Sequence, residues 1–270
     1  MEYKRLDKWR ERAELKGLLD LAQKPEELYY RGRWRKTLFD HGVAIVGSRR
    51  MSQYGRRVIE LIVPKLALEG KTIISGFMYG VDQYAHRVAL ASGGKTIAVL
   101  GWGIKERLEA SDEQLARDII KAGGSVLSEW EEQRAMLWTF PLRNRIVTAL
   151  SKEVIVVEAA LKSGSLITAA WAEKLGRKLW AVPGPINSQV SQGTNQLIAT
   201  GQAEMWLDHS YQPQLSQTKD PLILKVREEA MTASELARVL KQPVAEVGAQ
   251  LSLLALKGEV VEREGKYYAS

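Results

Sequence analysis

Short β-branched runs alternate with longer amphipathic stretches through most of this 270-residue chain. Strands of four or five residues separated by helices of ten or more predict βαβ units, in which successive strands run parallel. The predicted strands are Val43–Val46, Thr72–Ile74, Thr96–Leu100, Ser125–Leu127, Val154–Val157, Lys178–Val182 and Ala203–Trp206. Because runs such as VAIVG and VIVVE are apolar throughout, helices are expected on both faces of the sheet. The predicted fold class is therefore α/β, with a doubly wound, mostly parallel sheet.

The N-terminal segment and a polar stretch near the C-terminus depart from this alternation. Residues 1–24 predict a charged N-terminal helix, which Pro25 ends. One stripe of that helix carries Leu6, Trp9, Ala13 and Leu18. Residues 25–208 are assigned to the α/β domain. The segment 209–220 is polar and has no periodicity, so it is interpreted as a linker.

Residues 221–270 form a separate pattern. A helix near Leu222 is followed by a Thr232-x-x-Glu235 capping box, which predicts the start of a second helix. A third, leucine-rich helix begins at Pro243, and a β-ribbon from Glu259 closes the chain. Three helices and a ribbon in so short a segment predict a small winged-helix-like domain.

The distribution of charge favours a polyanionic partner for the larger domain. The formal net charge is +7, and the first 220 residues hold 32 basic against 25 acidic side chains, whereas the remainder is balanced. The absence of cysteine excludes thiolate chemistry and cysteine-ligated metals, and three dispersed histidines offer no metal-ligand spacing. No apolar run approaches about 20 residues, so a cytoplasmic protein without a membrane partner is expected.

Polar and basic residues follow several predicted strands, where ligands bind in a parallel sheet. Gly47-Ser48-Arg49-Arg50 follows the first strand and Ser75-Gly76 the second, while Phe140–Arg145 opens a helix before the fifth. After the fifth strand, Ser163-Gly164-Ser165 lies at a helix start, where free backbone N–H groups and the helix dipole favour anions. The guanidinium groups of the arginines add paired N–H donors, so these loops together are suited to binding phosphate groups.

The common catalytic and cofactor-binding motifs are absent or incomplete in this sequence. Gly101-Trp102-Gly103 follows a strand, but Glu106 occupies the third fingerprint position of a dinucleotide site. Neither a P-loop nor a nucleophile elbow occurs, so no catalytic residue, cofactor or metal is assigned. Glu158 at a strand end is interpreted as a structural hydrogen-bonding residue, and Asp82 as a residue that caps or orients its helix.

The order of these motifs resembles the DprA/Smf (DNA-processing protein A) family. The matching stretches are VAIVGSRR (Val43–Arg50), SGFMYGVDQYAHRVAL (Ser75–Leu90), GGKTIAVLGWG (Gly93–Gly103), SEW (Ser128–Trp130), FPLRNRIVTALS (Phe140–Ser151), VIVVEAALKSGSLITAAWAEKLGRKLWAVPG (Val154–Gly184) and GTNQLIATG (Gly193–Gly201). The resemblance implies an extended Rossmann-like fold and sequence-independent binding of single-stranded DNA. It further implies a homodimer that loads RecA recombinase during natural transformation and is not an enzyme.

The resemblance also implies a set of DNA contacts. They are Gly47, Ser48, Arg49, Ser75, Gly76, Arg143, Asn144, Ser163, Gly164, Ser165 and Thr168. The loop chemistry adds Arg50, Phe140 and Arg145. Where the family has small residues after Ser75-Gly76, this chain has Phe77, Met78 and Tyr79. These bulky residues oppose close approach of the DNA backbone at this loop, unless an aromatic ring stacks on a base instead.

Two other functions stay open at this point. A nucleotide-cleaving phosphoribohydrolase of the lysine-decarboxylase-like group has a related fold, and Glu158 would be its acid/base. A regulator that binds duplex DNA through residues 221–270 is the third hypothesis. Against the regulator, the third helix of that segment carries Lys257 as its one basic side chain, whereas a major-groove reader presents several donors.

Overall fold

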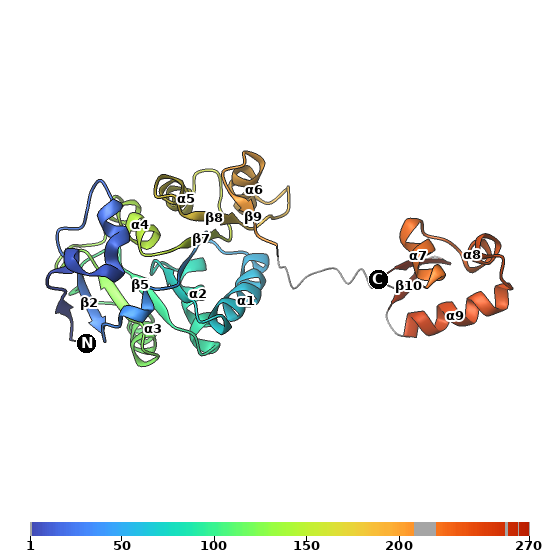
Figure 1. Ribbon diagram of the computed structural model, residues 1–270, viewed down its shortest axis with the longest axis horizontal. Coiled ribbons are helices and arrows are strands. Elements are labelled where there is room, and N and C mark those ends of the chain that lie inside the picture. The colour runs from blue at the N-terminus through green and yellow to red at the C-terminus, as the bar shows by residue number, and fades with distance from the viewer. Residues whose placement is uncertain (1, 208–219, 257–258, 264, 270) are drawn as a thin grey trace. The chain divides into compact units, whose positions relative to one another are not determined.

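The computed structural model describes residues 2–207, 220–256, 259–263 and 265–269, and its chain divides into two compact units (Figure 1). The larger unit is Met1–Leu207 and the smaller is Asp208–Ser270. Apart from Asp220, the predicted linker 209–220 lies outside the described residues. None of the helices within the described ranges has the length and apolar character that a bilayer crossing requires.

The larger unit is built on a nine-stranded sheet with the order β1-β2-β6-β5-β4-β3-β7-β8-β9. The strands from β3 onward pair in parallel, and β1 and β2 are antiparallel to their neighbours. Their bounds are Lys4–Arg5 (β1), Tyr29–Gly32 (β2), Gly42–Val46 (β3), Thr72–Ser75 (β4), Thr96–Val99 (β5), Ser125–Ser128 (β6), Glu153–Val156 (β7), Lys178–Ala181 (β8) and Glu204–Met205 (β9). The predicted mostly parallel α/β sheet is confirmed, and the antiparallel pair β1–β2 at one edge was not predicted.

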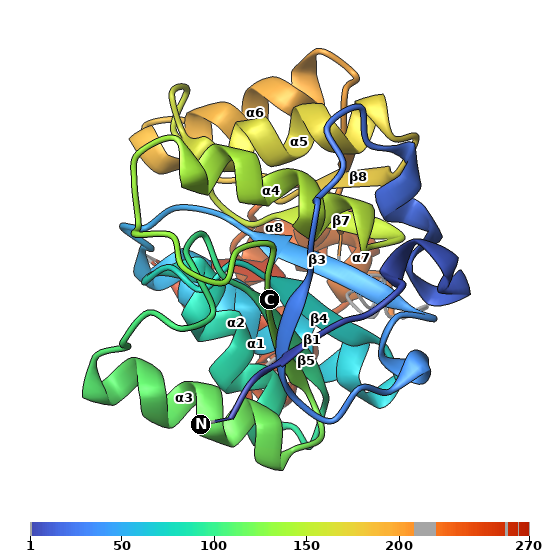
Figure 2. The same ribbon diagram turned by 90° about the vertical axis from the view of Figure 1, so that its left-hand side faces the viewer.

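Helices cover both faces of the sheet, in two layers that Figure 2 shows above and below it. The helices of one layer are α1 (Gln53–Leu68), α2 (Val81–Ala91) and α3 (Ala110–Lys121), and those of the other are α4 (Thr139–Ala149), α5 (Gly164–Lys174) and α6 (Gln192–Ala199). Strands β3 to β7 are almost fully buried between them. Their apolar side chains on both faces explain why the predicted runs lack polar alternation.

The prediction of one N-terminal helix over residues 1–24 is wrong. After β1, the chain forms two 3₁₀ segments, Trp9–Glu11 and Ala13–Asp20. Lys8 has a φ of 51°, in the left-handed region, so a regular helix cannot run through it. Further on, an added Cβ at Gly17 would lie 2.0 Å from the Ala149 carbonyl oxygen. Close backbone packing against α4, rather than helical periodicity, therefore determines the path of this segment.

The smaller unit contains three helices and a β-hairpin. These are α7 (Pro221–Glu228), α8 (Ala233–Leu240), α9 (Val244–Leu256), β10 (Val260–Arg263) and β11 (Lys266–Ala269). The predicted capping box is confirmed: the Glu235 N–H donates to Thr232 Oγ1 at 3.2 Å, and the Thr232 N–H donates to Glu235 Oε2 at 2.8 Å. Leu236, Val247 and Leu251 are fully buried in the small core that the helices share.

Candidate nucleic-acid interface

A cavity of about 470 Å³ lies beyond the carboxyl ends of β3, β4 and β7. This is the point at which the strand order reverses direction, since β4 lies on one side of β3 and β7 on the other. Twelve of the fourteen predicted site residues line it: Gly47, Ser48, Arg49, Arg50, Gly76, Phe140, Arg143, Asn144, Ser163, Gly164, Ser165 and Thr168. The loops that the sequence separates therefore meet at one place.

The cavity carries an excess of positive charge. Arg49, Arg50, Arg143 and Lys162 line it, against the single carboxylate of Asp82. The ion pairs found within the described ranges include none to Arg49, Arg50 or Lys162, which are all exposed. Cations that face one recess without counter-charges attract an anionic ligand.

Arg143 is the buried cation at the base of this site. Its side chain is 2 % exposed, and Nη1 donates to the Val99 carbonyl oxygen at the end of β5. Burial lowers the pKa of Arg143, the charge of Asp82 opposes that effect, and the like charge of Arg49 adds to it. Burial likewise raises the pKa of Asp82, although the charge of Arg143 opposes the shift. Arg143 and Asp82 are thus opposite charges in a poorly hydrated place, and the charge of the exposed Arg49 acts on both.

Gly76 is required by this arrangement. A Cβ added there would lie 2.2 Å from Arg143 Nη1 and 2.2 Å from Asp82 Oδ2. Those distances are far below van der Waals contact, so only glycine lets the buried arginine and its carboxylate approach the backbone.

The start of α5 supplies neutral donors on the opposite wall. Ser163 is the N-cap, its Oγ accepts from the Ser165 N–H at 3.3 Å, and the two hydroxyl oxygens lie 2.7 Å apart. Asn144 Nδ2 donates to the Gly164 carbonyl oxygen at 3.1 Å and so joins α4 to this turn. The amino end of an eleven-residue helix and the nearby cations favour the same kind of ligand.

Aromatic rings flank the cations. The Arg49 guanidinium lies 5.0 Å from the Phe140 ring centroid and 6.0 Å from that of Tyr79. Tyr79 is 58 % exposed and lines the cavity, whereas Phe77 is buried in the core with α3. Of the bulky residues in this turn, Tyr79 is therefore placed to meet a ligand and Phe77 stabilises the fold.

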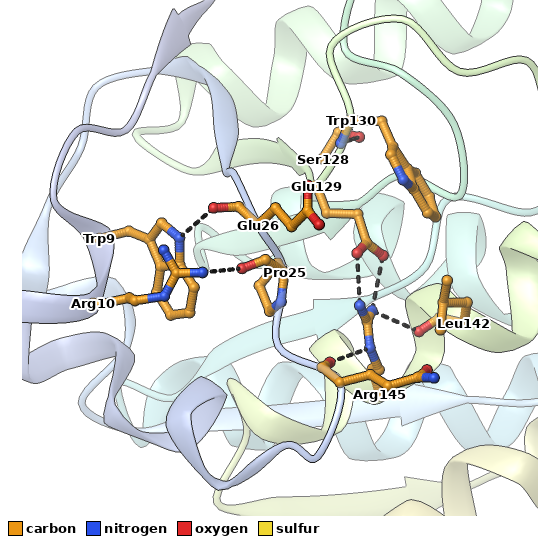
Figure 3. A network of polar contacts seen from close by, with 10 residues as sticks. Trp9, Arg10, Pro25, Glu26, Ser128, Glu129, Trp130, Leu142 and Arg145 are labelled. Atoms are coloured by element: carbon orange, nitrogen blue, oxygen red, sulfur yellow. Dashed lines mark hydrogen bonds and ion pairs between the residues drawn. The ribbon is translucent and has the colours of Figure 1, made fainter.

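Two predicted site residues lie elsewhere. Ser75 is fully buried, and its Oγ donates to the Ile45 carbonyl oxygen at 2.5 Å, across β3 and β4. Arg145 does not line the cavity and forms a bidentate ion pair with Glu129 at 2.8 and 2.6 Å (Figure 3). It also donates to the carbonyl oxygens of Gln23 and Leu142. With its donors occupied, Arg145 joins α4 to the N-terminal segment.

Sequence reasoning missed several lining residues. Lys162 lies in the loop after β7, next to the predicted Ser163. Its positive charge in that loop could have identified it as a phosphate-binding residue. Gln189 and Val190 come from the 3₁₀ segment Gln189–Ser191, which has no motif to identify it. Asp82 was interpreted as a helix-capping or orienting residue, yet it lines the cavity beside Arg143.

His86 in α2 contacts the loop that contains Gly76. The buried ring places Nε2 2.6 Å from the Gly76 carbonyl oxygen and Nδ1 2.6 Å from Thr96 Oγ1. Burial, together with the charge of Arg143, lowers the pKa of His86 to about 4 despite the hydrogen bond to Gly76. His86 is therefore neutral at physiological pH.

Acid is expected to destabilise the larger unit through His86. The unfolded histidine binds a proton near pH 6.5 and the folded one only near pH 4, so this contribution is complete above pH 6.5 and is lost as the pH falls. At pH 5 the loss amounts to about 2 kcal/mol. Urea denaturation across this range should show a shallower pH dependence for His86→Gln than for the wild type. Parallel curves for the two proteins would contradict the assignment, and the exposed His41→Gln serves as the control.

The fold and the cavity together define an α/β protein with a positively charged recess at the reversal point of its sheet. Residues 8–217 match the family model of DNA recombination-mediator protein A. The chain belongs to this DprA/Smf family.

Individual relatives agree with this assignment. The chain is 36 % identical to protein Smf of Escherichia coli over 93 % of its own length and 73 % of that protein. It is 39 % identical to the DNA processing protein DprA of Streptococcus pneumoniae over 68 % of its length, and it spans 64 % of that relative.

Solved structures of relatives share the fold. The Streptococcus pneumoniae DprA structure matches with a TM-score of 0.64 at 36 % identity, over 72 % of this chain and 68 % of that one. The Helicobacter pylori DNA processing protein A, whose structure concerns its single-stranded-DNA binding mode, matches with a TM-score of 0.68 at 32 % identity. That match covers 77 % of this chain and 92 % of the other.

Proposed function

We propose that the cavity binds the backbone of single-stranded DNA without regard to sequence. The observation that carries the proposal is the meeting of Arg49, Arg50 and Lys162, exposed and without ion pairs in the described ranges, with the Ser163 turn. Phosphates would accept from the guanidinium groups and from backbone N–H groups, while Tyr79 and Phe140 offer rings to bases. The DNA-binding mode of the Helicobacter pylori relative supports this proposal.

Removal of Arg49 tests the proposed interface. Arg49→Ala should weaken binding of labelled oligo-dT about tenfold, because one charge-assisted contact is lost. The slope of log affinity against log salt should become shallower by about 0.7, which corresponds to one phosphate of a single strand. Fluorescence anisotropy across a salt series measures both quantities.

The matched control is Arg87→Ala, an exposed arginine of α2 that does not line the cavity. It removes the same charge and should leave affinity and slope near their wild-type values. Equal affinities for Arg49→Ala and wild type, at unchanged melting temperature, would refute the interface.

The wider role follows from family membership as part of the proposal. The strands β5-β4-β3-β7-β8-β9 have the order expected of a Rossmann-like sheet. We propose that the chain is a cytoplasmic, non-catalytic homodimer that delivers single-stranded DNA to RecA. Its membership of the DNA recombination-mediator family supports this role.

The enzymatic alternative loses its acid/base in this geometry. Glu158 is 1 % exposed and does not line the cavity. Its carboxylate accepts from the Ser52 N–H at 2.9 Å and from the Ser52 hydroxyl, at the start of α1. A carboxylate occupied in this way is structural, and release of free base from nucleoside monophosphates is the assay that would contradict this conclusion.

For the smaller unit we propose a winged-helix-like protein-interaction module. The described part of α9 carries no basic side chain and exposes Val244, Leu253 and Leu256 instead. Exposed apolar side chains with the single charge of Glu246 suit a protein partner and not phosphates. Duplex binding by residues 221–270 alone would contradict this role.

A further inference from the structure

A second cavity, of about 570 Å³, lies on the α3 side of the larger unit. It is enclosed by Arg31 on β2, by the Lys105–Ala110 segment that follows β5, and by the first two turns of α3. A neighbouring hollow of about 440 Å³ shares Lys105, Glu106 and Arg107 with it and adds Glu132 and Arg134.

Arg31 is incompletely satisfied at this cavity. Its side chain is buried and lines the cavity, and one nitrogen donates to the Ile104 carbonyl oxygen. The ion pair with Glu113 is long, at 3.5 Å, and neither Nε nor Nη1 has a hydrogen-bond partner within the described part of the chain. Burial lowers the pKa of Arg31, and the charge of Glu113 opposes that shift. Glu113 therefore compensates the charge of this buried guanidinium only at a distance, and two of its nitrogens lack the hydrogen bonds that buried polar groups normally make.

The exposed rim of the cavity is also basic. Arg117 pairs with Glu113 at 3.5 Å, so Arg31 and Arg117 share one carboxylate. Lys105 pairs with Glu131 and Glu132, whereas the exposed Arg107 has no ion pair among the residues that the structure describes. Four cations and two carboxylates thus line the cavity, and the excess is positive.

The two cavities are neighbours along the same sheet edge. The first lies beyond β3, and the Lys105–Ala110 lining of the second follows β5. Strand β5 is two strands from β3 at about 4.8 Å per strand, so their carboxyl ends are separated by roughly 10 Å. The segment between β6 and α4 connects the two places, because its Arg134 lines the hollow and its Leu137 lines the first cavity. A single extended strand can therefore reach from one cavity to the other.

We propose that the second cavity binds a further phosphate of the same DNA strand, with Arg107 and Arg117 as its direct ligands and Arg31 as the buried charge behind them. This inference rests on the proposed function of the first cavity. It extends the interface across the carboxyl edge from β7 towards β2, and it makes affinity depend on the length of the strand.

The test compares short and long oligonucleotides on the full-length chain. Oligo-dT of about 4 nucleotides fills the first cavity, whereas one of about 16 nucleotides passes beyond it. Arg107→Ala and Arg117→Ala should each weaken binding of the long oligonucleotide about tenfold and reduce its salt slope by about 0.7. Both variants should bind the short oligonucleotide as the wild type does. Arg31 is left intact because its removal would open a void in the fold.

The matched control is Arg35→Ala. Arg35 is exposed and lies near Gly123, just beyond the other end of α3. It should leave binding of both lengths unchanged, and melting temperatures verify that all variants are folded.

The outcomes separate the two proposals. If the wild type binds oligo-dT and the two variants match it at both lengths, the second site is wrong and the first stands. An equal loss at both lengths would also overturn the second site, since general charge would then explain it. If the wild type binds neither oligonucleotide, the proposed function fails and this inference fails with it.

Discussion

Glu129→Ala is expected to lower the free energy of unfolding of the larger unit by about 4 kcal/mol. The Glu129 side chain is 6 % exposed and that of Arg145 is 3 % exposed. Two hydrogen bonds join them, and the Glu129 carboxylate thereby neutralises the charge of Arg145 (Figure 3). Truncation leaves a guanidinium buried without its counter-charge, and desolvation of that charge is what destabilises the fold. The loss corresponds to roughly 12 °C in melting temperature for a unit of this size.

Urea denaturation followed by tryptophan fluorescence measures this effect, because all eight tryptophans lie in the larger unit. The control is Glu131→Ala in the same loop, whose carboxylate pairs with Lys105 in an exposed position. This variant should lower the free energy of unfolding by less than about 1 kcal/mol. A similarly small cost for Glu129→Ala would show that Arg145 does not need its partner.

A double variant separates stability from binding. Replacing both partners, as Glu129→Leu with Arg145→Met, removes the buried charges together and should recover much of the lost stability. Since Arg145 does not line the cavity, oligo-dT affinity should stay at the wild-type value. Reduced affinity in the folded double variant would place Arg145 in the interface after all.

Gly80→Ala is expected to lower the free energy of unfolding by about 3 kcal/mol, because it introduces both backbone strain and steric overlap. Gly80 has a φ of 89°, and an added Cβ would lie 2.4 Å from the Ser48 carbonyl oxygen and 2.6 Å from that of Arg49. Both contacts are to backbone atoms, which cannot rotate away. Because Gly80 presses the loop before α2 against the loop after β3, the substitution should also displace Arg49 and weaken oligo-dT binding.

Gly70→Ala isolates the contribution of strain. Its φ of 73° is similar, but an added Cβ meets no atom within 4 Å. It should cost about 1 kcal/mol and leave binding unchanged. If Gly80→Ala behaves like Gly70→Ala in urea denaturation, the close approach of the two loops does not occur in solution.

The sheet could be predicted from the sequence because its signal is local. Apolar runs of four residues and the glycines and serines after them lie next to each other in the chain, and parallel pairing brings their ends to one edge. The grouping of twelve predicted residues around one cavity follows from that rule. Pairing of β2 with β6 is between segments far apart in the chain, and YYRG carries too little pattern to indicate it.

Residues of α4 show where such reasoning stops. Successive helical residues point about 100° apart, so Arg143, Asn144 and Arg145 cannot all face one recess. Seven of the eleven residues of α4 are buried and none is fully exposed, so the helix has no solvent-exposed polar face that would identify its orientation. Arg143 and Arg145 are identical in type, and only the positions of Val99 and Glu129 decide which of them reaches the cavity.

The two outermost strands of the sheet are also its shortest. Strand β1 has two residues, both basic and exposed, and strand β9 at the other margin has two as well. Margins this brief offer an incoming chain almost no free amide ladder to join. Copies of the larger unit should therefore not associate by joining their nine-stranded sheets into a continuous ribbon, and self-association through that unit should bury helix or loop surface instead.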